Sequence, residues 1–267
     1  MEETLVIGYG FAVVIGLIMG ILGGGGSILT VPVFVYLLGF DEVTSTAYSL
    51  FVIGVTSAVG AGKNVLRKNV HFKSALAFGL PSFVAIYFTR RYLIPEIPEE
   101  IFTLGTEVYT RKTLMLLFFS VLLILVALPM IKKRKLIFSD DLDKVLPYSK
   151  MVFQGITIGV LAGLVGAGGG FLILPALVLL SKLPTKKAIG TTLFIIAFNS
   201  LIGFSGDVQN IEVDWEFLLP FTAFSICGIL LGVYFSKFIE GPKLKRFFGF
   251  FVLIMAAYII VKELILY

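Results

Sequence analysis

Polar side chains recur seven residues apart in two apolar segments of this chain. Ser49 and Thr56 form one pair, and Thr192 and Asn199 form the other. Because seven residues are close to two helical turns, each pair lies on one face of a helix. Hydroxyl and amide groups hydrogen-bond a ligand well, but the sequence shows no nucleophile paired with a general base. The pattern favours binding over catalysis, so we predict no catalytic residue and no enzyme.

Two glycine-rich stretches break apolar segments before these pairs, MGILGGGGSILTVPVF at 19–34 and AGLVGAGGGFLILPAL at 162–177. Adjacent glycines interrupt a helix, and the next helix starts with unpaired N–H donors at the positive end of its dipole. In a membrane such donors must be buried in protein or line a wet cavity. We predict that a small anion lies between the breaks, and we expect Gly169 to need a positive φ. Close helix packing at small residues is the alternative.

The predicted substrate site joins the backbone of the two breaks to the polar pairs and to the residues directly before Ser49 and Thr192. A single hydroxyl often bonds to its own helix, so the duplicated arrangement matters more than any one residue. The predicted substrate-binding residues are Gly25, Gly26, Ser27, Ile28, Tyr48, Ser49, Thr56, Gly168, Gly169, Gly170, Phe171, Thr191, Thr192 and Asn199.

Cysteine and histidine usage argues against other kinds of site. Cys227 is the only cysteine and His71 the only histidine, so neither a disulfide framework nor a cluster of soft metal ligands can form within the chain. We predict no metal and no cofactor. Asp and Glu are absent from the interiors of the predicted membrane segments, so we also expect no buried carboxylate and no carboxylate proton relay.

The elements that carry these residues are expected to cross a membrane. Of 267 residues, 58% are hydrophobic and 15% are charged, whereas soluble domains have about 25% charged residues. Uncharged runs long enough to span a bilayer recur along the chain. The predicted segments are 5–22, 27–38, 43–62, 74–93, 113–131, 151–166, 170–181, 187–205, 217–236 and 246–262. Segments 27–38 and 170–181 are short, so broken or re-entrant helices are expected at the glycine motifs.

The chain is an internal repeat. Residues 15–62 and 158–205 align without a gap at an offset of 143, and 15 of the 48 aligned pairs are identical, shared glycines and a shared proline among them. We predict a first membrane repeat at 1–131, a cytoplasmic linker at 132–150 and a second membrane repeat at 151–267. The fold class predicted is therefore an all-α polytopic membrane protein with two repeats of about five segments each.

Charge predicts that the second repeat is inverted. The loop at 63–73 carries a formal charge of +4, while its equivalent at 206–216 carries −4. Lys and Arg concentrate in cytoplasmic loops, so the two loops should lie on opposite faces and both termini should be external. The basic charge thus sets topology and does not indicate nucleic acid. Arg90 and Arg91 would lie near the outer face, where they are expected to snorkel to the lipid headgroups.

The motifs GLVGAGGGFLILPAL, GTTLFIIAFNSLIGF and VDW, with weaker copies in the first half, resemble those of the TauE/SafE sulfite exporter family. The resemblance covers nearly the whole chain. It implies a multi-pass carrier in the plasma (inner) membrane for small sulfur-containing anions such as sulfite, sulfoacetate or thiosulfate. Tyr48 stands where a small polar residue is more usual in the family, and Gly24 and Ser27 distinguish the first glycine motif from the second.

Both lines of argument predict a secondary transporter that works by alternating access. The partners expected are a small anionic substrate and membrane lipid, without nucleic acid. An anion channel of the same fold, a carrier of a non-sulfur carboxylate and a membrane scaffold are the alternatives. The sequence leaves open the coupling ion (proton or sodium), the direction of transport and whether the protein forms a homo-oligomer.

Overall fold

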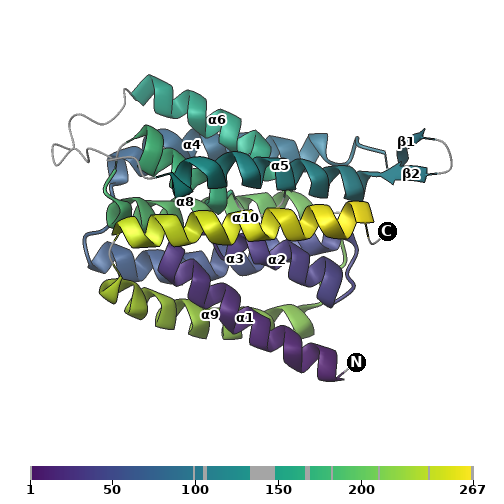
Figure 1. Ribbon diagram of the computed structural model, residues 1–267, viewed down its shortest axis with the longest axis horizontal. Coiled ribbons are helices and arrows are strands. Elements are labelled where there is room, and N and C mark those ends of the chain that lie inside the picture. Colours follow the sequence, from purple (N-terminus) through teal and green to yellow (C-terminus); the bar gives the residue numbers. More distant parts are fainter. Residues whose placement is uncertain are drawn as a thin grey trace.

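The protein is a bundle of helices that lie roughly side by side (Figure 1). The computed structural model describes residues 2–98, 100–104, 107–132, 148–165, 169–181, 183–209, 211–239 and 241–265. The predicted linker at 132–150 falls mainly outside these residues. The helices are α1 (Glu2–Leu22), α2 (Ser27–Pro32), α3 (Glu42–Leu66), α4 (Phe72–Phe88), α5 (Arg111–Ile131), α6 (Tyr148–Val165), α7 (Gly170–Pro175), α8 (Thr185–Asp207), α9 (Trp215–Phe235) and α10 (Gly241–Ile265).

Five helical stretches are long and apolar enough to cross a membrane, which confirms the predicted all-α polytopic class. They comprise α3, α4 with the turn that follows it, α5, α8, and α9 with its last turn. Shorter apolar helices accompany them, at Val6–Leu22, Ser27–Leu37, Ser149–Val165 and Gly170–Leu179. The short elements are those that flank the two glycine breaks, as the sequence predicts.

Two short helices, α2 and α7, each continue into a π-helical turn, and we call each helix with its turn a half-helix. In both half-helices the winding changes at a proline. Pro32 ends α2 and is followed by a π-helical turn at Val33–Leu37, and Pro175 ends α7 before the equivalent turn at Ala176–Leu180. Proline has no N–H and its ring crowds the preceding turn, so the ordinary ladder of helical bonds cannot continue through it. The wider winding restores bonding, with Leu38 N–H donating to Val33 O (3.0 Å).

The two ends of the bundle differ in what they carry. A hairpin of β1 (Glu100–Leu104) and β2 (Glu107–Thr110), absent from the predicted segments, projects between α4 and α5. Figure 1 shows the hairpin, the start of α1 and the end of α10 at the same end, here called the hairpin end. The opposite end carries the turn between α3 and α4 and is called the basic end. The termini therefore share one end of the bundle.

Helix contacts recur in equivalent pairs. Gly16 of α1 lies against the backbone of Ser225 in α9, and Gly159 of α6 lies against Ser82 in α4, so closely that no side chain would fit at either glycine. Gly16 and Gly159 are 143 residues apart, and so are Ser82 and Ser225. At Gly16 and Gly159 the alternative explanation holds, because these glycines bring two helices together.

Hydrogen bonds at the starts of α4 and α9 repeat the same offset. The Thr191 hydroxyl accepts from His71 N–H (2.9 Å), and the Tyr48 hydroxyl accepts from Asp214 N–H (2.6 Å). His71 and Asp214 in turn cap α4 and α9 with their side chains. Each half of the chain thus fixes the N-cap residue of a helix in the other half.

Candidate functional site

The two glycine breaks meet in the middle of the bundle. A methyl group on Gly24 would stand 3.0 Å from the Cα of Gly170, so the two backbones are in contact. Ile196 of α8 packs against both glycines and fills the space beside them. The structure thus brings together the motifs that the sequence places 143 residues apart, and it does so without a gap between these two glycines.

The backbone of the breaks confirms the positive φ predicted for Gly169 and reduces the number of N–H groups that could bind an anion. Gly169 has a φ of 70°, the left-handed conformation expected for it, whereas its equivalent Gly26 has a φ of −65°. At the first break Ser27 N–H donates to Gly24 O (3.1 Å) and Ile28 N–H to Gly25 O (3.3 Å), so these two predicted donors already have partners.

The remaining predicted donors have a different status. Within the part of the chain that the structure describes, the N–H groups of Gly25 and Gly26 donate to no backbone carbonyl oxygen. Gly170 and Phe171 are the first two residues of α7, where a helix leaves N–H groups unpaired. Gly168 lies outside the described residues.

The polar pairs of α3 and α8 are fully buried, and each has an atom without a partner among the described residues. These atoms are the hydroxyl oxygens of Ser49, Thr56 and Thr192 and the amide nitrogen of Asn199. The amide oxygen of Asn199 accepts from the Ser82 hydroxyl (3.0 Å), which leaves its NH₂ group as the free donor. Leaving a buried polar group unpaired costs about 1–3 kcal/mol, and these four lie on two helices that contact each other.

Tyr48 and Thr191 have a structural part in this arrangement. Their hydroxyls hold the starts of α9 and α4, and Thr191 also donates to Lys187 O (2.7 Å). Both side chains are buried. Sequence reasoning grouped them with the ligand-binding residues because they adjoin the polar pairs, but each points its polar atom at another helix start.

Buried charge is where two expectations are wrong. Arg90 does not snorkel to the headgroups: it is 1% exposed and forms an ion pair with Asp207 of α8. Its guanidinium also donates to the hydroxyl of Thr46 (3.0 Å) and to Gly163 O (3.3 Å). With a carboxylate and two further oxygens as acceptors, the arginine has no need of the headgroups.

The expected absence of buried carboxylates is also contradicted. Asp207 and Glu263 are 4% and 5% exposed, and Glu263 accepts from the Tyr36 hydroxyl (2.6 Å). Both acids lie just past an uncharged run, but their helices continue to Asp207 and Ile265. Neighbouring helices cover the residues beyond each uncharged run. The uncharged runs alone do not show that these residues are buried.

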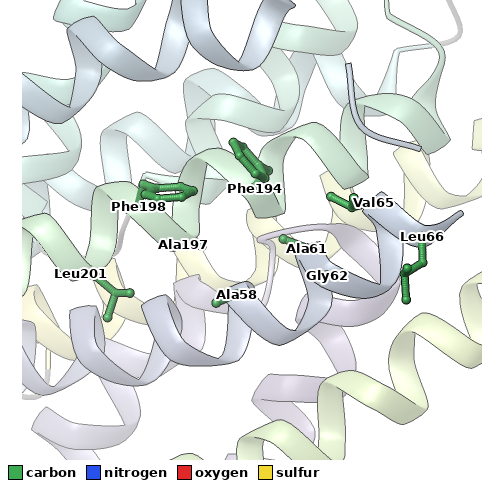
Figure 2. Close-up of a pocket in the computed structure, with 9 residues that line it drawn as sticks. All are labelled: Ala58, Ala61, Gly62, Val65, Leu66, Phe194, Ala197, Phe198 and Leu201. Atoms are coloured by element: carbon green, nitrogen blue, oxygen red, sulfur yellow. The ribbon is translucent and has the colours of Figure 1, made fainter. Parts of the chain in front are cut away.

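An apolar cavity between α3 and α8 is unsuited to an anion. Its volume is about 560 Å³, and Figure 2 shows that carbon side chains line it on both sides. Its residues are Ala58, Ala61, Gly62, Val65, Leu66, Phe194, Ala197, Phe198 and Leu201. None of these side chains has a hydrogen-bond donor, and a charged ligand would be desolvated there without compensation.

Comparison with known proteins gives a consistent picture. The family model of the sulfite exporter TauE/SafE matches residues 8–259. A protein of Xylella fastidiosa named "Probable membrane transporter protein" is 27% identical over 97% of this chain and 95% of its own length. The "Probable membrane transporter protein YunE" of Bacillus subtilis is 30% identical over 84% of this chain and 87% of its own. No solved structure matches the chain.

Proposed function

Because the chain belongs to the sulfite exporter TauE/SafE family of membrane transporters, we propose that it moves a small sulfur-containing anion by alternating access. Sulfite, sulfoacetate and thiosulfate are the substrates proposed. The observation that carries the proposal is the set of buried, unpartnered polar atoms on Ser49, Thr56, Thr192 and Asn199. In a membrane protein such atoms are retained where a polar ligand passes.

The half-helices supply the charge that the polar side chains lack. Ser27–Leu37 and Gly170–Leu180 both begin at a break, and each helix N-terminus is equivalent to roughly half a positive charge. An anion between the breaks would receive hydrogen bonds from the four polar side chains and from N–H groups such as those of Gly25 and Gly26, which donate to no backbone oxygen of the described residues. Inverted-repeat transporters bind substrates at broken helices of this kind.

The contacts that fill the centre support the proposed alternation. The breaks touch at Gly24 and Gly170 with Ile196 against both, so an anion can bind only when these elements separate. The ion pair of Arg90 and Asp207 joins α8 to the turn after α4 at the hairpin end. We propose that this end is external, that the repeats are inverted, and that the ion pair breaks when the transporter opens outward.

Flux of thiosulfate into proteoliposomes tests the function. A carrier gives saturable uptake and counterflow, in which unlabelled thiosulfate inside accelerates entry of the labelled anion. A channel gives flux without counterflow, and a scaffold gives none. Stabilisation of the purified protein against heat by a panel of sulfur oxyanions and small carboxylates would identify the substrate class, and stabilisation by carboxylates alone would contradict the proposal.

The driving ion is tested in the same vesicles. Imposed proton and sodium gradients should be applied separately, with thiosulfate uptake as the readout. Acceleration by only one gradient would assign the coupling, and acceleration by neither would assign uncoupled exchange.

A further inference from the structure

A small polar cavity lies at the basic end of the bundle. Its volume is about 120 Å³, and its lining is Asn64, Arg67, Asn69, Lys186, Ile189, Ser236 and Lys237. Since each molecule of liquid water occupies about 30 Å³, the space equals about four waters and suits a small oxyanion. Six of the seven lining residues are polar or charged, and none carries a carboxylate.

Three cations converge on this cavity from three separate parts of the chain. Arg67 directly follows α3, Lys186 lies in the first turn of α8, and Lys237 follows α9. The Arg67 guanidinium donates to Val233 O (3.0 Å), which holds it in place and leaves its other N–H groups for a ligand. Within the described residues none of the three has an ion-pair partner, and the Lys237 ammonium lies 5.3 Å from the centre of the Tyr234 ring. Like charges gathered around one space attract an anion there.

The floor of the cavity connects it to the first glycine break. Ile189 lines the cavity, and a methyl group on Gly23 would stand 2.7 Å from its side chain. Seven residues further along α8, Ile196 packs against Gly24 and Gly170. The unpartnered hydroxyl of Thr192 lies on α8 between these two isoleucines. Ile189 therefore joins the cavity to the first glycine break, and Thr192 of the proposed transport site lies about one helical turn further along α8.

We propose that this cavity is a vestibular anion site, where Arg67, Lys186 and Lys237 hold a small oxyanion before it passes Ile189. The passage rests on the proposed function, whereas the binding does not. Lysines at a cytoplasmic face are expected for topology alone. That expectation accounts for Lys63, Lys68 and Lys73, which are exposed at the same end of the bundle and outside the cavity lining, but not for the convergence of the other three cations on one cavity.

Charged thiol reagents measure the cavity directly. In a Cys227→Ala background, Ser236→Cys is reacted with anionic sulfonatoethyl methanethiosulfonate and with its cationic trimethylammonium analogue, in phosphatidylcholine nanodiscs. After correction for the reactivity of a free thiol, the anionic reagent should react about tenfold faster or more. The ratio should fall toward one in Arg67→Gln/Lys186→Gln/Lys237→Gln. It should change less than about twofold in Lys63→Gln/Lys68→Gln/Lys73→Gln, which removes the same charge from the same end.

Sulfate serves as the probe of occupancy, and lipid composition separates the two sources of an oxyanion. Sulfate at millimolar concentration should slow the anionic reagent in phosphatidylcholine discs and lose that effect in the cavity triple variant. If the anionic reagent is slowed only by added phosphatidylglycerol, and not by sulfate, the site binds a lipid headgroup and the vestibular site is overturned. Equal loss of the ratio in both triple variants, or a ratio near one in the parent protein, would also overturn it. Normal reagent ratios without thiosulfate flux would refute the proposed function and leave the cavity site standing.

Discussion

The hairpin end and the basic end are built from equivalent positions with different side chains. Arg90 and Asp207 form an ion pair at the hairpin end, whereas their equivalents at the basic end, Val233 and Asn64, carry no charge. Thr46 accepts from the guanidinium at one end, while its equivalent Ile189 lies on the floor of a cavity at the other. Different side chains at positions 143 residues apart thus give one end a buried ion pair and the other a polar cavity.

The two glycine breaks differ in a similar way. The positive φ angles lie at Gly23 and Gly24 in the first break and at Gly169 in the described part of the second. Shared sequence therefore does not impose a shared backbone. The halves meet at a centre where Gly24, Gly170 and Ile196 touch, so a movement of either half changes the space available to the other.

The largest effect is expected from breaking the ion pair at the hairpin end. Asp207→Asn leaves Arg90 buried without a counter-charge, which should lower the free energy of unfolding by about 3–5 kcal/mol. Denaturant unfolding in mixed micelles measures it. Glu212→Gln is the matched control, because Glu212 is exposed in the same region and should change stability by less than about 1 kcal/mol.

A double variant separates the charge from the closure. Arg90→Met with Asp207→Leu removes both charges, so much of the stability should return while the tie between the ends of α4 and α8 is lost. The interior of the bundle should then become more accessible from the hairpin end. If Asp207→Asn costs no more than Glu212→Gln, the ion pair does not hold this end closed.

Next comes the backbone of the second break. Gly169→Ala should abolish thiosulfate transport, because its φ of 70° opposes a side chain and the added methyl would stand 2.7 Å from Cβ of Ala162. Gly39→Ala isolates the backbone strain, since Gly39 has a φ of 72° with open space around it. That control should cost about 1–2 kcal/mol of stability and leave transport intact. Equal loss of transport in both variants would show that strain alone, and not the break, is responsible.

A smaller effect is expected at the polar pairs. Asn199→Ala should weaken thiosulfate binding about tenfold, which corresponds to about 1.4 kcal/mol, and Thr56→Val should have a similar effect at the equivalent position. Ser120→Ala is the control, because this buried hydroxyl bonds to Leu117 O in its own helix (2.7 Å). Binding measured by calorimetry decides: equal, small changes in all three would move the anion away from α3 and α8.

The smallest perturbation tests the orientation of the two ends. Lys68→Cys and Glu212→Cys, each in a Cys227→Ala background, alter exposed side chains and should leave transport unchanged. A membrane-impermeant maleimide should label Glu212→Cys from outside the cell and Lys68→Cys only after permeabilisation. Labelling of both from the same side would contradict the inverted repeat and the assignment of the hairpin end as external.

The sequence by itself determined that the protein lies in a membrane, where its apolar segments are and where glycines break them. Uncharged runs and glycine positions are local properties, and they are enough to place each helix within a few residues and to pair the two motifs at one offset. Asn199, Thr56 and their partners could be singled out in the same way, because a seven-residue spacing sets the helical face without reference to any other element.

Only the tertiary structure decided which charges are buried and which hydroxyls are free. Arg90 and Asp207 are separated by 117 positions, and nothing local to either shows that α8 will cover the turn after α4. The Tyr48 hydroxyl accepts a hydrogen bond from Asp214 N–H, 166 positions away, whereas the hydroxyl of its neighbour Ser49 has no partner among the described residues. The burial of a polar group depends on what packs over it, and in a bundle that partner comes from a distant segment.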